Sequence, residues 1–342
     1  MKLTVHLVIW NGAKYLPYLF KSLRNQTFKD WELIVLDNNS SDNSVELVIQ
    51  ELNNWSQPKK FIKNLVNTGF AGGHNQIYAA TDSEYFLLLN QDFYLQPDCL
   101  EKLVEEIKNK PAVAVVSPRL MTWNFAEIEN NGLTKSLANT IDSLGLKVLR
   151  NRRVIELGAG EKWSGTEQKT QSVFGVSGAA PLFRRAHIEQ IAFSDQEFFD
   201  NSYGSYKEDV DLAWRLQASG FGAEVVLDAV IYHDRSVAGP VILSDQAAGT
   251  NKKRQSDWVQ YQSYKNHLMT LFKNEYWQNL TLDFFFILWY ELKKFVWFLL
   301  FKPTVLKGLG EIWCLRKELN SKRKLIKSKR KIAWQQLRQW WS

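Results

Sequence analysis

The chain has 342 residues, of which 45% are hydrophobic and 23% are charged, an ordinary composition for a globular protein with a full core. This length fits one sizeable domain with an appendage. The two cysteines, Cys99 and Cys314, lie far apart in the sequence. They exclude a disulfide framework and a thiolate metal cluster, and they fit a reducing compartment.

Positive charge is concentrated at the C-terminus. Residues 302–342 contain twelve Lys and Arg against two Glu, whereas the whole chain carries a net charge of +7. The remainder is therefore mildly acidic, and the basic tail is a separate functional question. The first residues form too short an apolar run for a signal peptide, so we expect a first strand there and a cytoplasmic protein.

In chain order, apolar runs of strand length alternate with segments of helical spacing. The predicted elements are strand 5–9, helix 15–23, strand 32–36, helix 45–52, strand 61–66, a helix through residue 80, and strand 85–89. Such alternation predicts an α/β, Rossmann-like, mostly parallel sheet with helices on both faces.

The second half of the chain is less regular. Residues 121–169 are rich in Asn, Gly and Lys, and we expect loops and irregular strands that flank a binding cleft. The elements predicted after them are strand 172–178, helix 185–191, helix 209–219, and strands 223–227 and 230–232. His233 lies at the carboxyl end of the last predicted strand.

Polar residues follow three of the predicted strands. Trp10 and Asn11 follow the first strand, Asp37 follows the second, and Asp92 follows strand 85–89. Ligands of such sheets bind beyond the carboxyl ends of the strands, so these residues should converge on one rim.

Two groups of carboxylates are candidates for metal binding or catalysis. Asp92 follows a buried run of leucines, where a rigid carboxylate can bind a hard cation, although a simple loop cap is the alternative. Glu208, Asp209 and Asp211 lie at a predicted helix start, where an acidic cap is the alternative because the helix dipole favours anions. Asp211 lies on another helix face and is expected to be structural. His74, beside a glycine pair, is expected in a solvated loop.

Six sequence blocks occur in an order that is typical of one family. The blocks are Val8-Ile9-Trp10-Asn11, Val35-Leu36-Asp37-Asn38-Asn39-Ser40-Ser41-Asp42, Asn67-Thr68-Gly69-Phe70-Ala71-Gly72-Gly73-His74-Asn75, Leu87-Leu88-Leu89-Asn90-Gln91-Asp92, Val176-Ser177-Gly178-Ala179 and Tyr206-Lys207-Glu208-Asp209-Val210-Asp211-Leu212. With Ile231-Tyr232-His233 after them, residues 1–240 resemble the family 2 glycosyltransferases, particularly the rhamnosyltransferase-like members that extend bacterial surface polysaccharides. The resemblance implies the GT-A fold, inverting sugar transfer from a nucleotide donor to a hydroxyl, and a divalent metal ion, Mg²⁺ or Mn²⁺.

The resemblance also implies a nucleotide-sugar site. Its members would be Trp10, Asn11, Asp37, Asn39, Asn67, Gly69, Gly72, Gly73, Asn75, Asn90, Gln91 and Asp92. Asp37 and the Trp10-Asn11 turn would hold the base, and the glycines would let the backbone approach the donor diphosphate. In the family's Asp-any-Asp motif, Asn90 replaces the first acid; it can bond a ribose hydroxyl but carries no charge, so we expect a modest metal affinity.

The remaining implied roles concern the reaction. Asp92 and His233 would bind the metal, although a purely structural histidine is the alternative for His233. Asp209 would be the catalytic base. Glu208 would orient Asp209 or the acceptor, and Gly178 would also contact the acceptor.

The C-terminal residues are predicted to lie on a membrane. Residues 280–301 are rich in Phe, Trp and Leu but are interrupted by four charged residues, so they should not span a bilayer. The basic stretch 322–331 and Trp334, Trp340 and Trp341 suit helices on an anionic membrane surface. The alternative is a set of ordinary core helices with a solvated basic face.

We therefore divide the chain into a catalytic domain, residues 1–240, and a helical region, residues 241–342, with the donor-binding half in 1–120 and the acceptor-binding half in 121–240. The expected enzyme is cytoplasmic and peripheral on the inner face of the cell membrane. Its donor would be linked to dTDP, UDP or GDP, and its acceptor would be a saccharide on polyprenyl diphosphate. A catalytically silent, membrane-docked protein that binds sugar nucleotide or polysaccharide is the alternative, and nucleic-acid binding by the tail is not expected.

Overall fold

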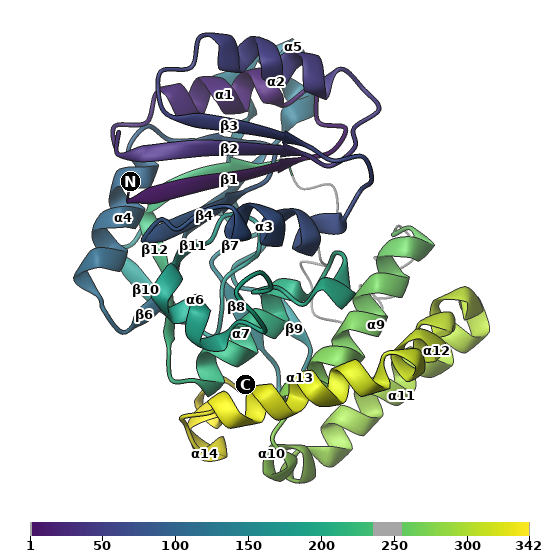
Figure 1. Cartoon of the computed structure of the whole chain (residues 1–342). Helices are drawn as coiled ribbons and strands as arrows, with labels where there is room; N and C mark the ends of the chain where they lie inside the picture. The colour runs from purple at the N-terminus through teal and green to yellow at the C-terminus, as the bar shows by residue number, and fades with distance from the viewer. Residues whose placement is uncertain (1, 235–254, 342) are drawn as a thin grey trace.

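The computed structural model describes residues 2–234 and 255–341. The predicted boundary at residue 240 lies outside these residues. A twisted sheet lies between two layers of helices, and a further group of helices from the C-terminus covers one side of the molecule (Figure 1).

The sheet has ten strands among the described residues, in the order β10-β12-β6-β11-β4-β1-β2-β3, with β5 and β7 paired to β12 and β6. The strands are β1 (Leu3–Ile9), β2 (Trp31–Asp37), β3 (Lys59–Lys63), β4 (Tyr85–Leu89), β5 (Phe93–Leu95), β6 (Val113–Trp123), β7 (Leu137–Ser143), β10 (Thr170–Val173), β11 (Leu182–Arg184) and β12 (Gly222–His233). Strands β3, β2, β1 and β4 are parallel neighbours, whereas β11 is antiparallel to β4 and β6. The predicted α/β, mostly parallel sheet is confirmed.

Alternation within the strands produces two cores. In β4, Tyr85, Leu87 and Leu89 belong to one apolar cluster, and Phe86 and Leu88 belong to the other. The first cluster contains residues of α1 (Leu16–Arg24), α2 (Ser44–Asn53) and α4 (Cys99–Asn109), and the second contains residues of α3 (Gly69–Ala79), α6 (Arg185–Ile191) and α7 (Glu208–Ala218). Helices therefore cover both faces, as predicted.

The middle of the chain is more regular than its composition indicates. Strand β6 continues to Trp123, α5 (Ile128–Ser136) follows it, and β8 (Leu146–Val148) pairs with β9 (Val154–Glu156) in a hairpin. The strand expected at 172–178 ends at Val173. The two strands expected at 223–232 are one strand, β12, whose register shifts between Val226 and Val230.

His74 does not lie in a solvated loop. It is fully buried in α3, 4.4 Å from the Phe70 ring between centroids, and it faces the ring of His6. Burial lowers the pKa of His74 to about 3, so the ring is neutral. The expectation failed because helix α3 begins at Gly69 and places this side chain against the sheet.

The C-terminal helices pack against the sheet domain. They are α9 (Asp257–Asn274), α10 (Trp277–Leu282), α11 (Phe284–Phe301), α12 (Lys307–Cys314), α13 (Arg316–Lys329) and α14 (Trp334–Leu337). Helix α9 contacts α7, and α13 contacts α9 and α6 (Figure 1). Among the residues that the structure describes, none of the helices has the length and apolarity needed to cross a bilayer.

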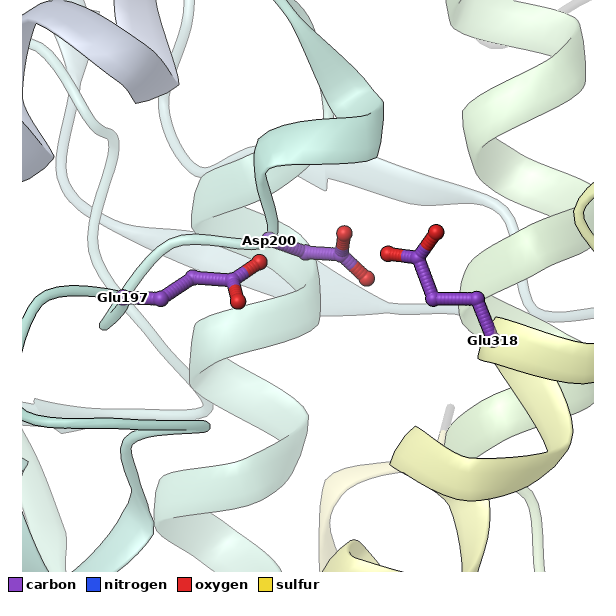
Figure 2. Close-up of side chains that lie close together, drawn as sticks. All are labelled: Glu197, Asp200 and Glu318. Carbon is purple, nitrogen blue, oxygen red and sulfur yellow. The ribbon is translucent and has the colours of Figure 1, made fainter.

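Buried ion pairs join these helices to the sheet domain. Three carboxylates, those of Glu197, Asp200 and Glu318, converge in Figure 2 as if around a metal ion. The cation there is the Lys322 ammonium, which lies 2.8, 2.7 and 2.7 Å from oxygens of the three. Lys273 of α9 also pairs with Asp200 and lies 2.9 Å from a carboxylate oxygen of Asp211 in α7.

Part of the predicted membrane-binding tail is thus structural. Trp340 and Trp341 pack with Phe174, and Trp341 also packs on Trp214, while Trp334 joins the same apolar cluster. Lys322 is buried, whereas Lys324 and Lys327 are exposed. Lys322 is not available to a membrane, because it neutralises buried carboxylates, and the half-buried tryptophan rings cover the apolar edge of α7. Membrane contact by the rest of the stretch 322–331 stays a prediction.

Replacement of Lys322 should destabilise the whole domain. The substitution Lys322→Met removes one partner of a buried ion pair, so we expect a loss of about 3 kcal/mol in the free energy of unfolding. Exposed Lys324 in the same helix provides the control, and Lys324→Met should change stability by less than about 0.5 kcal/mol. Urea titrations followed by circular dichroism measure both, and equal stabilities would contradict the role of the network.

Candidate active site

One cavity of about 1450 Å³ opens beyond the carboxyl ends of β1 and β4. Its walls come from the turns after these strands, from the start of α7, from the β8–β9 hairpin and from helices α9 and α11. Asp92 and Asp209, which are distant in sequence, both line it. Asp37 does not line it, because this side chain is fully buried beside the cavity wall.

Asp92 and His233 form one end of the cavity. The Nε2 atom of His233 lies 3.4 Å from Oδ2 of Asp92, and its Nδ1 atom lies 2.9 Å from Oδ2 of Asp142. Antiparallel pairing of Phe93 in β5 with His233 in β12 brings Asp92, which directly precedes β5, beside the end of β12. Burial alone would lower the pKa of His233, but Asp92 and Asp142 raise it to about 9.

This arrangement fits a divalent cation. A metal-ligating histidine commonly donates its second ring N–H to a carboxylate, which fixes the tautomer and aims the free nitrogen at the ion. Asp142 occupies that position, and Asp92 adds a carboxylate oxygen beside Nε2. Asn90 also lines the cavity here and can add a neutral oxygen.

The turn after β1 is held by side chains from other strand ends. Gln91 accepts a hydrogen bond from the Trp10 backbone N–H (2.8 Å) and donates one to the Trp10 carbonyl (2.9 Å). Asn11 accepts from the Ser41 N–H (2.8 Å). Trp10 lines the cavity and keeps 54% of its surface exposed, so its ring is accessible to a ligand.

The turn after β2 and the turn before α3 are joined by hydrogen bonds. Asp37 accepts from the Ser40 N–H at 3.2 Å, and Asn39 is exposed in a left-handed conformation. Asn38 donates to Oδ1 of Asn67 at 3.0 Å, and both residues line the cavity. Asn38 is thus a site residue that the sequence blocks contain but that was not singled out.

Six of the predicted donor-binding residues are absent from the cavity lining, namely Asn11, Asp37 and Asn39 in the first two turns and Gly72, Gly73 and Asn75 in α3. A Cβ atom at Gly73 would lie 3.0 Å from Val8 of β1, so this glycine permits helix–strand packing, and one at Gly72 would lie 2.9 Å from Thr68 at the N-terminus of the same helix. Asn75 is buried and bonds the backbone of Phe198 and Phe199. The placement of these three α3 residues follows from the start of α3 at Gly69, which turns this segment into a buried helix.

Gly69 does line the cavity, and it requires a glycine for two reasons. Its φ of +74° is strained for other residues, and a Cβ atom would lie 2.6 Å from the Gly204 carbonyl oxygen. The Ala71 N–H also donates to this carbonyl at 3.0 Å. The start of α3 and the loop before α7 are therefore in direct backbone contact.

Asp209 lies in the first turn of α7 and faces the cavity. Its carboxylate accepts hydrogen bonds from the backbone N–H groups of Gly178 (3.0 Å) and Val210 (2.7 Å). A Cβ atom at Gly178 would lie 3.3 Å from the Asp209 Cβ atom, so the glycine permits this close approach. Gly178 and Asp209 are thus brought together at the cavity wall.

Glu208, the neighbouring residue, differs in its environment. It lines the cavity but is 7% exposed, and its Oε2 atom has no hydrogen-bond partner among the described residues. Burial and the adjacent Asp209 charge raise the pKa of Glu208 to about 8. Glu208 therefore carries a proton at neutral pH, which it can donate in a hydrogen bond.

The structure adds residues that the sequence did not indicate. The C-terminal helices contribute a wall that includes Trp258, Tyr264, His267, Tyr290 and Lys294. Asp142, which orients His233, also belongs to the site. These residues lie outside the sequence blocks, and neither spacing nor composition distinguishes them from core or surface positions.

Comparison with known proteins identifies the class of this fold. The structure of GalNAc-T7 with UDP, GalNAc and Mn²⁺ matches with a TM-score of 0.58 at 12% identity, over 79% of this chain and 47% of that one. A mannosyltransferase of Pyrobaculum calidifontis, in complex with GDP-Man and Mn²⁺, matches with a TM-score of 0.52 at 16% identity, over 92% of this chain and 75% of that one. These likenesses show the GT-A fold.

The family follows from the sequence. The model described as "Glycosyl transferase family 2" matches residues 4–191, more than half of the chain. The chain therefore belongs to this family and is a glycosyltransferase, as the sequence blocks predicted. The match ends before Glu208, so it does not test the roles of α7 and His233.

Curated relatives are distant, and the match covers less than half of each of them. An uncharacterized glycosyltransferase of Nostoc sp. is 29% identical over 153 residues, which are 42% of this chain and 47% of that protein. The poly-beta-1,6-N-acetyl-D-glucosamine synthase of Staphylococcus epidermidis is 21% identical over 214 residues, which are 61% of this chain and 44% of that protein. This chain spans about half the length of these relatives.

The raised pKa of Glu208 predicts a pH-dependent stability. The folded protein keeps a proton that the unfolded chain releases above its ordinary pKa of 4.5, so the free energy of unfolding falls as pH rises from there through about 8. In Glu208→Gln this decline should be shallower, because glutamine does not titrate. Urea midpoints at about pH 6 and about pH 9 measure it, with exposed Glu105→Gln as control. Equal declines in Glu208→Gln and wild type would contradict a protonated Glu208.

Proposed function

We propose that this glycosyltransferase moves a sugar, with rhamnose as the first candidate, from a nucleotide donor to a hydroxyl of a lipid-linked saccharide during synthesis of a bacterial surface polysaccharide. The observation that carries the proposal is the shared cavity in which Asp92 and His233 lie with Asp209. The named relatives include a polysaccharide synthase, and the matched structures hold UDP or GDP-Man with Mn²⁺. The resemblance of the sequence blocks supports rhamnose.

In the proposed reaction, Asp209 removes the proton from the acceptor hydroxyl. The acceptor oxygen bonds to the anomeric carbon while the bond from that carbon to the nucleotide diphosphate breaks, which inverts the configuration. Backbone hydrogen bonds from Gly178 and Val210 hold the Asp209 carboxylate in place for this step. Glu208, protonated and beside it, orients the acceptor.

The donor would lie between the strand-end turns and the Asp92–His233 pair. Trp10 offers an exposed ring to the base, and Asn67, Gly69, Asn90 and Gln91 line the remaining surface. Asp92 and His233 would hold Mg²⁺ or Mn²⁺, which would stabilise negative charge on the departing diphosphate. The proposal admits donors linked to dTDP, UDP or GDP.

A membrane surface is proposed for helix α11. Ten of its apolar residues are exposed, namely Phe284, Phe285, Phe286, Leu288, Trp289, Leu292, Val296, Leu299, Leu300 and Phe301. An exposed apolar face of this size indicates an interaction surface. Basic residues of the next two helices are exposed as well, namely Lys307 in α12 and Arg316, Lys324 and Lys327 in α13. Their positive charge favours an anionic bilayer as the partner.

The substitution Asp209→Asn tests the reaction. We expect transfer to fall at least about a hundredfold, because the base is lost, while binding of the donor with Mn²⁺ stays near the wild-type value. Asp92→Asn should weaken Mn²⁺-dependent donor binding itself. A screen of dTDP-, UDP- and GDP-sugars with and without Mn²⁺, by calorimetry and product analysis, measures both effects. Transfer that persists in Asp209→Asn would refute the base assignment.

The membrane surface is tested by substitution, since deletion would remove the structural Lys322. Trp289 and Leu300 are 62% and 68% exposed, so the double substitution Trp289→Glu with Leu300→Glu should leave folding intact. We expect it to lower affinity for phosphatidylglycerol vesicles at least about tenfold in a sedimentation assay. Ile49→Glu, at an exposed apolar position in α2, is the control and should have no effect. Unchanged sedimentation of the double variant would exclude α11 as the docking helix.

A further inference from the structure

The cavity has positively charged residues that the proposed transfer step does not use. Arg153 precedes β9, Lys207 precedes α7, and Lys294 lies in α11, and all three line the cavity. They come from three separate parts of the chain. The fold therefore gathers them at the wall that the β8–β9 hairpin and the C-terminal helices build.

These cations are incompletely neutralised by the protein. The Lys294 ammonium lies 3.4 Å from a carboxylate oxygen of Glu291, whose other oxygen is 2.7 Å from Nε2 of His267. Among residues 2–234 and 255–341, no hydrogen bond or ion pair involves the side-chain nitrogens of Arg153 or Lys207. Because a half-buried charge without a partner is less favourable than a paired one, this wall is suited to an anionic ligand.

The same groups lie within electrostatic range of one another. Burial lowers the pKa of Lys207, the carboxylates of Asp209 and Glu156 oppose this effect, and the charge of Lys294 adds to the lowering. Burial also lowers the pKa of Lys294, and the positive charge of Arg153 lowers it further. One anion placed among the three would relieve both repulsions.

The surroundings of Lys294 are aromatic. Its ammonium lies 4.8 Å from the ring centroids of Tyr264 and Tyr290. Tyr290, Lys294 and Phe298 are spaced four residues apart, and all three face the cavity from α11. The opposite side of the same helix carries the exposed apolar residues described above. An amphiphilic ligand, with an anionic head beside an apolar chain, matches this wall.

We propose that Arg153, Lys207 and Lys294 bind the phosphate or diphosphate group of the acceptor, and that an isoprenoid chain leaves the cavity along α11. This inference rests on the proposed function. The donor diphosphate has a separate place beside Asp92 and His233, at the strand ends. Lys207 directly precedes Glu208 and Asp209, so the bound phosphate lies between the reacting hydroxyl and the membrane-facing helix.

Binding of farnesyl diphosphate to the full chain tests this site. In titrations followed by tryptophan fluorescence, Lys294→Ala should weaken binding about tenfold or more, because a charge-assisted contact is lost. Lys294→Arg should restore most of the affinity. Lys324→Ala, at the exposed position in α13, should bind like the wild type. Thermal melts of each variant show whether it is folded.

Three further ligands distinguish the sources of binding. Farnesol should bind weakly and equally to all variants, and inorganic pyrophosphate should bind more weakly than farnesyl diphosphate. If pyrophosphate bound as tightly, the isoprenoid assignment would be wrong. UDP with Mn²⁺ should bind wild type and Lys294→Ala alike, and a parallel loss would assign these cations to the donor instead.

Different binding results would refute the proposed function and the phosphate site. A wild-type protein that bound none of the dTDP-, UDP- and GDP-sugars with Mn²⁺ would refute the donor assignment, whatever the result with Lys294→Ala. Conversely, normal donor binding with farnesyl diphosphate affinity unchanged in both Lys294→Ala and Arg153→Ala would refute only the phosphate site.

Discussion

The ion pairs that Lys273 and Lys322 make with buried carboxylates hold the parts of this enzyme in their relative positions. Asp200 lies in the loop before α7, Asp211 lies within α7, and the two lysines come from α9 and α13. Burial alone would raise the pKa of Asp200, but the two ammonium groups keep it well below its ordinary value. Each group in such a network depends on the others, since an unpaired charge in the interior costs several kcal/mol. The start of α7, with Glu208 and Asp209, is therefore positioned by the C-terminal helices.

This dependence changes the meaning of the C-terminal region. A basic, aromatic tail looks like a detachable appendage, yet its helices form one wall of the cavity and its tryptophans cover α7. Under the proposed membrane docking, helix α11 would contact the membrane and also line the cavity. Attachment and acceptor binding would share one structural unit.

Sequence reasoning found the elements whose evidence is local. Alternation of strands and helices, the placement of Asp92 and His233 at strand ends, and the acidic start of α7 all follow from periodicity and from the position of residues at element ends. It failed where contacts between distant segments of the chain determine the position of a residue. The sequence blocks predict that the segment after Asn67 lines the donor pocket, but Gly73 packs on Val8 and Asn75 bonds a distant loop. Two of the three partners of Lys322, Glu197 and Asp200, are separated from it by more than a hundred residues, which no spacing rule detects.

The position of α11 has a consequence for how substrate would be supplied. An α-helix with its side chains is about 10–12 Å thick, so a single helix would separate the hydrocarbon surface from the reaction chamber. On the docking proposed above, an anchored acceptor would need to lift only its head group past this barrier, and the extended product would stay in the same leaflet. Encounter between enzyme and acceptor would then be governed by lateral diffusion and by surface density rather than by bulk concentration.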